Sequence, residues 1–429
     1  MIYVPSRMGQ LNRRALIRQL QKFGVASRAD LAKALGMSQP TAGKIVDELI
    51  AMEVIEEAIM TALPADKLAA RGVGDPVGPL GRPGRKLRLN QSRVQFLGIH
   101  LGVNTTMLAG LTLGASGEDR WPVAFEIGGA DASPAKAWEK KLRQAANSLG
   151  DDEYLGVLLS APGVVDEEEN RVLFSPNMHW TEKNDIAAII GRIWDVPVLL
   201  VQEERALAMG HHLADPDFED FLLVDFGEGV GGAIIVEGNP FASPLPISGE
   251  IGHTPVPGNV RPCGCGAVGC VETLISVRGL LESFSAAAPT VDHSWSGLGD
   301  YISQNGIKPW LARALDLAAA AIAGALNVLG LRRVVVTGSL TELPPVVMEH
   351  LSHAVRNGAM WARFGKVECV SAPRRRTAGM VAMGIDRLVL PEVKRESPTT
   401  GLRPLAEYTW SGAKSTSPPK NPTPKKKKT

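Results

Sequence analysis

The sequence lacks three features that would narrow its function at once. Its formal net charge is only +1, so the overall charge does not discriminate between classes of partner. No stretch resembles a signal peptide or a membrane span, and we therefore expect a cytoplasmic protein without a membrane partner. Cysteine is scarce, with four among 429 residues, and in a reducing cytosol these thiols are not expected to form disulfides. A chain of this length is too long for one core and predicts two or three domains.

Three of the four cysteines nevertheless lie close together, in a short segment rich in glycine and proline. His253 is followed after nine residues by Cys263, Cys265 and Cys270, whereas Cys369 lies far away in the sequence. Zinc favours four nitrogen or sulfur ligands in a tetrahedron, and this set supplies all four. Because no position is left open for water, the spacing predicts a structural zinc. The alternatives are disulfides or a chance cluster.

The same segment resembles the signature of a known family. It reads Glu-x-Gly-His over residues 250–253 and Cys-x-Cys-Gly-x-x-Gly-Cys-x-Glu over residues 263–272. This pattern resembles the ROK family (repressors, open reading frames, kinases), which contains sugar kinases and repressors that respond to sugars such as N-acetylglucosamine, xylose or glucose. The resemblance runs from about Phe96 to Leu390. It implies an α/β chain with a two-lobed actin/hexokinase-like (ribonuclease H-like) ATPase fold.

The N-terminal segment extends the resemblance to the repressor branch. Residues 8–57 predict three helices, each with one apolar face. A capping-box pattern at Ser27 and Asp30 opens the second helix, Gly36 ends it, and Ser38 opens the third. The apolar face predicted for the first helix consists of Leu11, Ala15, Leu16, Leu20 and Phe23. Two short helices joined by a tight turn predict a helix-turn-helix that binds DNA, the alternative being a small helical domain that binds protein.

The start of the third helix offers polar side chains to the major groove. Ser38, Gln39, Thr41 and Lys44 are the candidates for contacts with base edges or phosphates. Residues 54–55 and 87–89 are expected to form the strands of a wing.

A basic stretch without an acid follows the predicted helices. Its members are Arg82, Arg85, Lys86, Arg88 and Arg93. Gly81-Arg82-Pro83-Gly84-Arg85 resembles the Gly-Arg-Pro segment of many repressors of the family. Arg82 and Arg85 are therefore candidates for minor-groove contacts, and a simple basic linker is the alternative.

The resemblance also implies a sugar site. Sugar hydroxyls are bound by planar polar side chains, and the matching positions are Asn177, Glu203, Glu250, His253 and Glu272. Glu203 stands where the kinases carry their aspartate base. We expect one ring nitrogen of His253 to bind zinc and the other to face a sugar hydroxyl. The alternative for the two glutamates that flank the metal motif is that they are solvated loop residues.

Three departures from the kinase motifs argue against phosphoryl transfer, which needs a base and a cradle for phosphates. His100 and Asn104 replace the acid and the threonine of the first phosphate motif. Glu228 replaces the threonine of the second, and its charge would repel a phosphate. Glu203 is one methylene longer than the usual aspartate. The sequence therefore predicts no enzyme, no catalytic residues and no binding of ATP.

These observations predict five segments along the chain. They are a winged helix-turn-helix over 1–60, a wing and linker over 61–94, a first lobe over 95–205, a second lobe over 206–395 whose last helix can return to the first lobe, and a disordered basic tail over 396–429.

We interpret the chain as a transcriptional regulator, a repressor, that binds a double-stranded operator as a homodimer or tetramer and responds to a sugar or sugar derivative. Two alternatives stay open: a sugar kinase with a DNA-binding appendage, and a regulator controlled by a partner protein.

Overall fold

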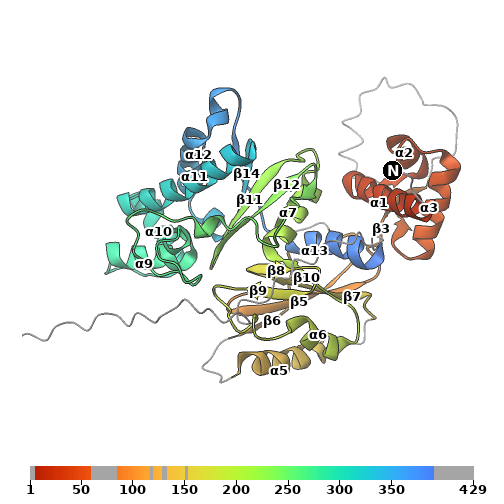
Figure 1. The fold of residues 1–429 in the computed structure, drawn as a ribbon, viewed down its shortest axis with the longest axis horizontal. Helices are drawn as coiled ribbons and strands as arrows, with labels where there is room; N and C mark the ends of the chain where they lie inside the picture. Colours follow the sequence, from red (N-terminus) through yellow and green to blue (C-terminus); the bar gives the residue numbers. More distant parts are fainter. Residues whose placement is uncertain (1–4, 59–84, 116–118, 128–132, 150–152, 391–429) are drawn as a thin grey trace, which may run out of the picture.

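The chain forms a small helical domain followed by two α/β lobes (Figure 1). The computed structural model describes residues 5–58, 85–115, 119–127, 133–149 and 153–390. Arg82, most of the predicted linker and the predicted basic tail lie outside these ranges. The arrangement confirms the predicted α/β class with an N-terminal winged helix-turn-helix.

The N-terminal domain packs α1 (Pro5–Phe23), α2 (Arg28–Ala34) and α3 (Gln39–Ala51) against a small sheet. The capping box is confirmed, because Ser27 Oγ accepts the Asp30 N–H at 3.1 Å and Asp30 Oδ2 accepts the Ser27 N–H at 2.9 Å. The predicted wing is confirmed as well: β2 (Ile55–Glu57) pairs antiparallel with β3 (Lys86–Leu89). A two-residue strand, β1 (Ala26–Ser27), pairs with the other edge of β3 and is too short to be predicted from a sequence pattern.

The predicted apolar face of α1 is partly wrong. Leu16 and Leu20 are buried together with Ile17, but Leu11 and Phe23 are 43% and 45% exposed. Leu11 precedes Leu16 by five residues, which places it about 140° away around the helix at 3.6 residues per turn, and Phe23 is the last residue of α1. Leu11 therefore lies off the buried face, and Phe23 lies at the end of the helix.

The first lobe contains a five-stranded sheet in the order β10–β7–β4–β5–β6. Its strands are β4 (Phe96–Leu101), β5 (Thr105–Leu111), β6 (Val123–Glu126), β7 (Gly156–Ala161) and β10 (Val198–Gln202). Side chains of α5 (Pro134–Ala146) and α6 (Ile186–Trp194) share a core with one face of this sheet. A two-stranded hairpin, β8 (Val164–Asp166) and β9 (Arg171–Phe174), accompanies the sheet.

The second lobe contains another five-stranded sheet, in the order β13–β12–β11–β14–β15. Its strands are β11 (Phe221–Phe226), β12 (Val230–Val236), β13 (Asn239–Pro240), β14 (Arg333–Gly338) and β15 (Glu368–Ser371). The surrounding helices are α8 (Glu272–Ile275), α9 (Val277–Ala287), α10 (Trp295–Asn305), α11 (Pro309–Leu329) and α12 (Pro345–Gly358). By length and composition α11 could cross a membrane. It carries Leu315, Ile322 and Leu326 into the lobe's core.

Two helices lie between the sheets, α7 (Glu203–Ala214) and α13 (Arg376–Gly384). They cross at Gly210 and Gly379, where a Cβ on either residue would collide with the carbonyl of the other helix segment. Although α13 follows the last strand of the second lobe, it contacts β4, β7 and β10 of the first lobe.

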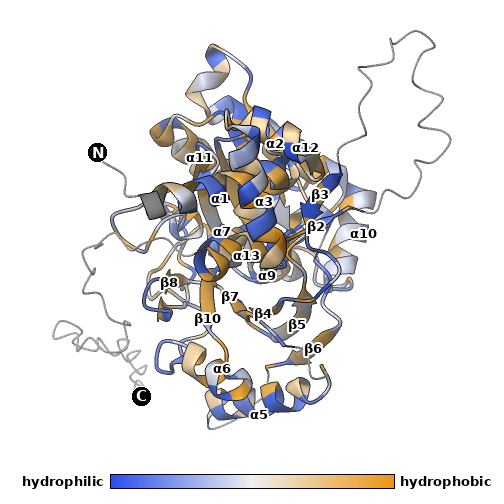
Figure 2. Cartoon of the chain, turned by 90° about the vertical axis from the view of Figure 1, so that its right-hand side faces the viewer, coloured by the Kyte–Doolittle hydropathy of each residue, from blue (hydrophilic) through white to orange (hydrophobic). Residues whose placement is uncertain are grey.

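The end of α13 also meets the N-terminal domain. A π-helical turn, η4 (Ile385–Val389), continues α13, the helix that lies beside α1 in Figure 2. Arg14 Nε donates a hydrogen bond to the Leu390 carbonyl at 3.0 Å, and Arg18 lies 3.5 Å from the Asp386 carboxylate. The hydrophobic cores of the N-terminal domain and the first lobe are continuous at this place.

Candidate functional site

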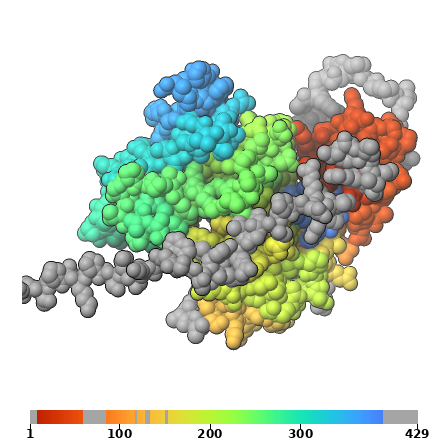
Figure 3. All heavy atoms as spheres, viewed as in Figure 1, coloured from red at the N-terminus to blue at the C-terminus, as the bar shows by residue number. Residues whose placement is uncertain are grey.

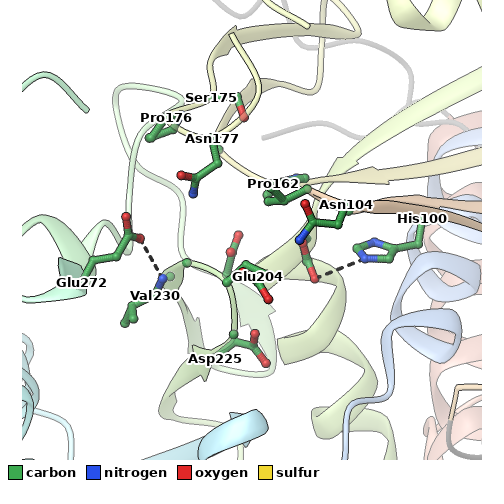
Figure 4. A pocket seen from close by; sticks show the side chains of 18 of the residues that line it. His100, Asn104, Pro162, Ser175, Pro176, Asn177, Glu204, Asp225, Val230 and Glu272 are labelled. Atoms are coloured by element: carbon green, nitrogen blue, oxygen red, sulfur yellow. Dashed lines mark hydrogen bonds and ion pairs between the residues drawn. The ribbon is translucent and has the colours of Figure 1, made fainter. Parts of the chain in front are cut away.

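A cavity of about 410 Å³ is formed by residues of both lobes. Figure 3 shows the second lobe, green to cyan, lying against the yellow first lobe. The cavity brings together all five residues predicted to bind a sugar: Asn177, Glu203, Glu250, His253 and Glu272. Figure 4 shows side chains from the two lobes pointing into the same space. The proposed role of these residues in binding a sugar stays a prediction.

The Cys3His set lies at one side of the cavity. His253 Nδ1, at the end of η1 (Ile251–His253), is 3.5 Å from Cys263 Sγ, and Cys265 Sγ is 3.6 Å from Cys270 Sγ. All four ligand atoms lie within 4.8 Å of one another, a grouping that no other set of such side chains forms in the described ranges. Ligands of a tetrahedral zinc, at about 2.0–2.3 Å from the ion, are separated by roughly 3.3–3.8 Å. The donor set therefore fits zinc.

Glycine makes the metal loop possible. Gly269 has φ +88° and lies so close to Asn259 that a Cβ would approach its carbonyl oxygen to 2.6 Å. Burial raises the pKa of the Cys263 and Cys270 thiols above their ordinary values. A cation in the loop would counter this effect by favouring the thiolates.

The metal loop contacts the predicted sugar residues directly. Nε2 of His253, the nitrogen away from Cys263, is 3.6 Å from Glu250 Oε2. Oε2 of Glu272 accepts the Val230 N–H at 2.9 Å (Figure 4). Gly264 lies against Asn177 of the first lobe, where a Cβ would be 3.3 Å from its Oδ1. A bound metal would thus hold residues of both lobes in place, as ligand shells of metals commonly do.

The floor of the cavity contains charged residues that the sequence analysis missed. Asp225, at the end of β11, accepts hydrogen bonds from Arg374 Nε and Nη2 at 2.8 and 2.7 Å. Arg376 binds Glu203 and, at 3.1 Å, Asp119. Two signals could have pointed to them: an acid at the end of an apolar strand, and three consecutive arginines before an apolar helix.

Glu203 is therefore held by a cation. Arg376 binds its Oε1, and His100 Nε2 lies 3.8 Å from the same atom. Burial, with the nearby Arg376 and Arg374, lowers the pKa of His100 well below its ordinary value. His100 is consequently neutral at physiological pH, and Glu203 is not a free carboxylate.

The start of α3 is open to solvent, as a DNA contact requires. Gln39, Thr41 and Lys44 are exposed. The hydroxyl of Ser38 caps α3 and hydrogen-bonds to Thr41 Oγ1 at 2.8 Å.

The predicted basic stretch is largely neutralised. Arg85 pairs with Glu57 at 2.6 Å and Arg88 with Glu56 at 2.8 Å. Lys86 pairs with Asp30, and Arg93 with Glu53. Glu56 and Glu57 lie on β2, which pairs antiparallel with β3, whereas Asp30 lies on α2 and Glu53 precedes β2. A minor-groove role for Arg85 stays a prediction, and Arg82 lies outside the described residues.

A winged helix-turn-helix joined to a two-lobed fold, with a Cys3His loop at the interlobe cavity, defines a class of sugar-kinase-like regulatory proteins. The sequence profile "ROK family" matches residues 126–389, and the chain belongs to this family. The profile "Winged helix-turn-helix DNA-binding" matches residues 11–56.

Relatives and solved structures agree with this assignment. The chain is 24% identical over 289 residues to the xylose repressor of Caldicellulosiruptor bescii, covering 64% of this chain and 65% of the relative. It is 24% identical over 379 residues to the Escherichia coli transcriptional dual regulator NagC, covering 82% of this chain and 86% of the relative. The crystal structure of a ROK family transcriptional regulator, homologous to E. coli MLC, shares the fold with a TM-score of 0.68 at 19% identity, over 90% of this chain and 98% of that one. Sugar kinases of the family are also among the relatives and the solved structures.

Proposed function

We propose that this protein is a DNA-binding transcriptional regulator, a repressor, whose ROK domain senses a sugar or sugar derivative. The observation that carries the proposal is the placement of α13. Its first residue, Arg376, lines the cavity, and the turn that follows it contacts the N-terminal domain. A single helix thus touches both the candidate effector site and the candidate DNA-binding domain.

This placement suggests how the two sites communicate. A sugar that contacts Glu203 would change the surroundings of Arg376 and so the position of α13 between the lobes. Arg14 would transmit this shift to α1 through its hydrogen bond to the Leu390 carbonyl. To act as an inducer, the sugar must bind more tightly to the arrangement with low operator affinity, because equal affinity shifts no equilibrium.

The relatives support a role in carbohydrate metabolism, since they include a xylose repressor and an N-acetylglucosamine repressor. We propose that the active protein holds a structural zinc through His253, Cys263, Cys265 and Cys270. We also propose that the protein is cytoplasmic.

We propose three domains. Residues 1–60 would form the winged helix-turn-helix, residues 95–205 the first lobe and residues 206–395 the second lobe.

We infer that the protein does not transfer phosphate. Glu203, at the position of the kinase base, is already bound by Arg376. Neutral His100 and Glu228 occupy the two phosphate motifs, so the cavity lacks a cradle for ATP.

We also propose a homodimer, with a second copy of the chain covering an exposed apolar patch. The patch consists of Val328, Met360, Trp361 and Phe364, which are 86%, 50%, 47% and 70% exposed. Asn327 joins its two halves by hydrogen bonds to Gly358 and Met360 at 3.1 and 2.7 Å. Large adjoining apolar side chains on a surface mark interaction sites, and helix-turn-helix proteins read palindromes as dimers.

Replacing Phe364 with glutamate is expected to weaken the dimer by at least tenfold, because the charge would be buried against the second copy. Sedimentation velocity over a concentration series measures the effect. Leu245→Glu, at an exposed apolar residue outside the patch, serves as the control. If Phe364→Glu sediments as the wild type does, the patch is not the interface.

The function is tested by selecting DNA sites with the full-length zinc-loaded protein and measuring their affinity by fluorescence anisotropy. We expect a palindromic site, and a loss of about 1–3 kcal/mol on Gln39→Ala if Gln39 contacts a base. Arg278→Ala, on the exposed surface of α9, should bind as the wild type does. A panel of sugars, amino sugars, sugar phosphates and ATP is then added to the complex.

Release of the operator by a sugar supports the proposal. Intact operator binding without any response would favour control by a partner protein instead. If the protein phosphorylates a hexose with ATP, and Glu203→Gln abolishes this activity, the sugar-kinase alternative is supported.

A further inference from the structure

One carboxylate oxygen of the cavity has no partner. Oε2 of Glu204, the second residue of α7, is buried and accepts no hydrogen bond within the described part of the chain. Gly231 leaves room for this side chain, because a Cβ there would collide with Glu204 Oε1. Burial, followed by the charges of Glu203 and Glu250, raises the pKa of Glu204 well above its ordinary value. A buried carboxylate oxygen without a hydrogen bond is costly, and no described side chain pairs with Glu204 Oε2.

The arginines of the cavity do not compensate Glu204. Arg374 is engaged in two hydrogen bonds with Asp225, and Arg376 is bound to Glu203. The described residues that line the cavity include no lysine. The described lining of the cavity therefore offers Glu204 no arginine or lysine that is not already paired with another carboxylate.

Glu250 adds a second carboxylate from the opposite lobe. Its contact is Nε2 of His253, whose Nδ1 faces the cysteines. Glu204 and Glu250 belong to no group of three or more convergent metal ligands in the described residues.

We propose that the cavity binds a sugar with a free ammonium group, an amino sugar, and that this group lies between Glu204 and Glu250. The inference rests on the proposed sensor function and names the chemical class of its effector. An ammonium supplies one positive charge and three hydrogen-bond donors to two carboxylates. A neutral sugar would leave Glu204 without a counter-charge, and a phosphate ester would face it with a like charge.

The test is isothermal titration of the full-length zinc-loaded protein. Glucosamine, galactosamine and mannosamine are each compared with their N-acetyl form, the parent hexose and the hexose 6-phosphate. We expect one free amine to bind at least tenfold more tightly than its three counterparts. Glu204→Gln should abolish this preference, whereas Glu219→Gln, at an exposed residue outside the cavity, should keep it.

A melting curve of Glu204→Gln shows whether a loss of the amine preference is due to unfolding of the variant. Because Glu204→Gln removes a buried charge, its melting temperature should equal or exceed that of the wild type. If an acetylated, neutral or phosphorylated sugar binds best and releases the operator, the ammonium proposal is wrong and the sensor stands. If none of the sugars binds while operator binding is intact, the sensor fails and this inference with it.

Discussion

Replacing Cys263 with serine is expected to abolish stoichiometric zinc and to lower the melting temperature by on the order of 5–10 °C. Cys263 is buried, and its sulfur lies beside His253 and near Glu272. The loss of one ligand would free the loop that holds Glu250 and packs on Asn177, so effector affinity should fall together with the metal. Zinc per chain is measured by plasma emission spectrometry, and stability by scanning calorimetry.

Cys369→Ser is the matched control for this experiment. Cys369 is also a buried cysteine of the second lobe, but it lies on β15, outside the metal set. Its replacement should retain one zinc per chain and the effector affinity. Equal zinc content in Cys263→Ser and the wild type would show that the Cys3His set is not the metal site.

Replacing Arg376 with methionine is expected to destabilise the protein by about 3–5 kcal/mol, the cost of leaving buried charges uncompensated. The Arg376 side chain is only 4% exposed, and its partners Asp119 and Glu203 are 10% and 13% exposed. Urea unfolding measures the change in the free energy of unfolding. Since Arg376 connects the cavity to α13, the variant that remains folded at low temperature should bind operator without responding to the effector.

Two further variants separate charge from packing. Arg278→Met removes a 71% exposed arginine and should change the free energy of unfolding by less than about 0.5 kcal/mol. The triple variant Arg376→Met, Asp119→Asn, Glu203→Gln removes the unpaired charges and should regain much of the lost stability. If Arg376→Met alone is as stable as the wild type, Arg376 does not hold buried charges together and cannot connect the cavity to α13.

The sequence predicted best what depends on short spacings. The metal set spans residues 253–270, and its convergence follows from glycines within the same loop. The capping box at Ser27 likewise depends on a local pattern, and each strand of the β2–β3 wing could be predicted from its own short segment. The five predicted sugar residues could be placed because each falls in a motif that resembles a known family, and the cavity brings them together.

What the sequence did not predict depends on surfaces that meet only in the folded chain. Arg374 and Asp225 are 149 residues apart in sequence, and Arg376 and Glu203 are 173 apart. No spacing rule connects such pairs, because their contact follows from how α13 returns to the first lobe. The ion pair of Arg85 could not be predicted either, because its partner Glu57 lies 28 residues earlier in the sequence, on β2.

The docking of η4 against α1 has a consequence for the engineering of biosensors. To change operator specificity, the DNA-binding domain can be exchanged between relatives. This exchange assumes that the domain makes no specific contact with the rest of the chain. Here Arg14 and Arg18 belong to that domain, whereas Asp386 and the Leu390 carbonyl belong to the other end of the chain. A chimera cut near residue 90 would keep the operator preference of its donor but lose inducibility. Transplanting residues 385–390 together with the donor domain should restore it.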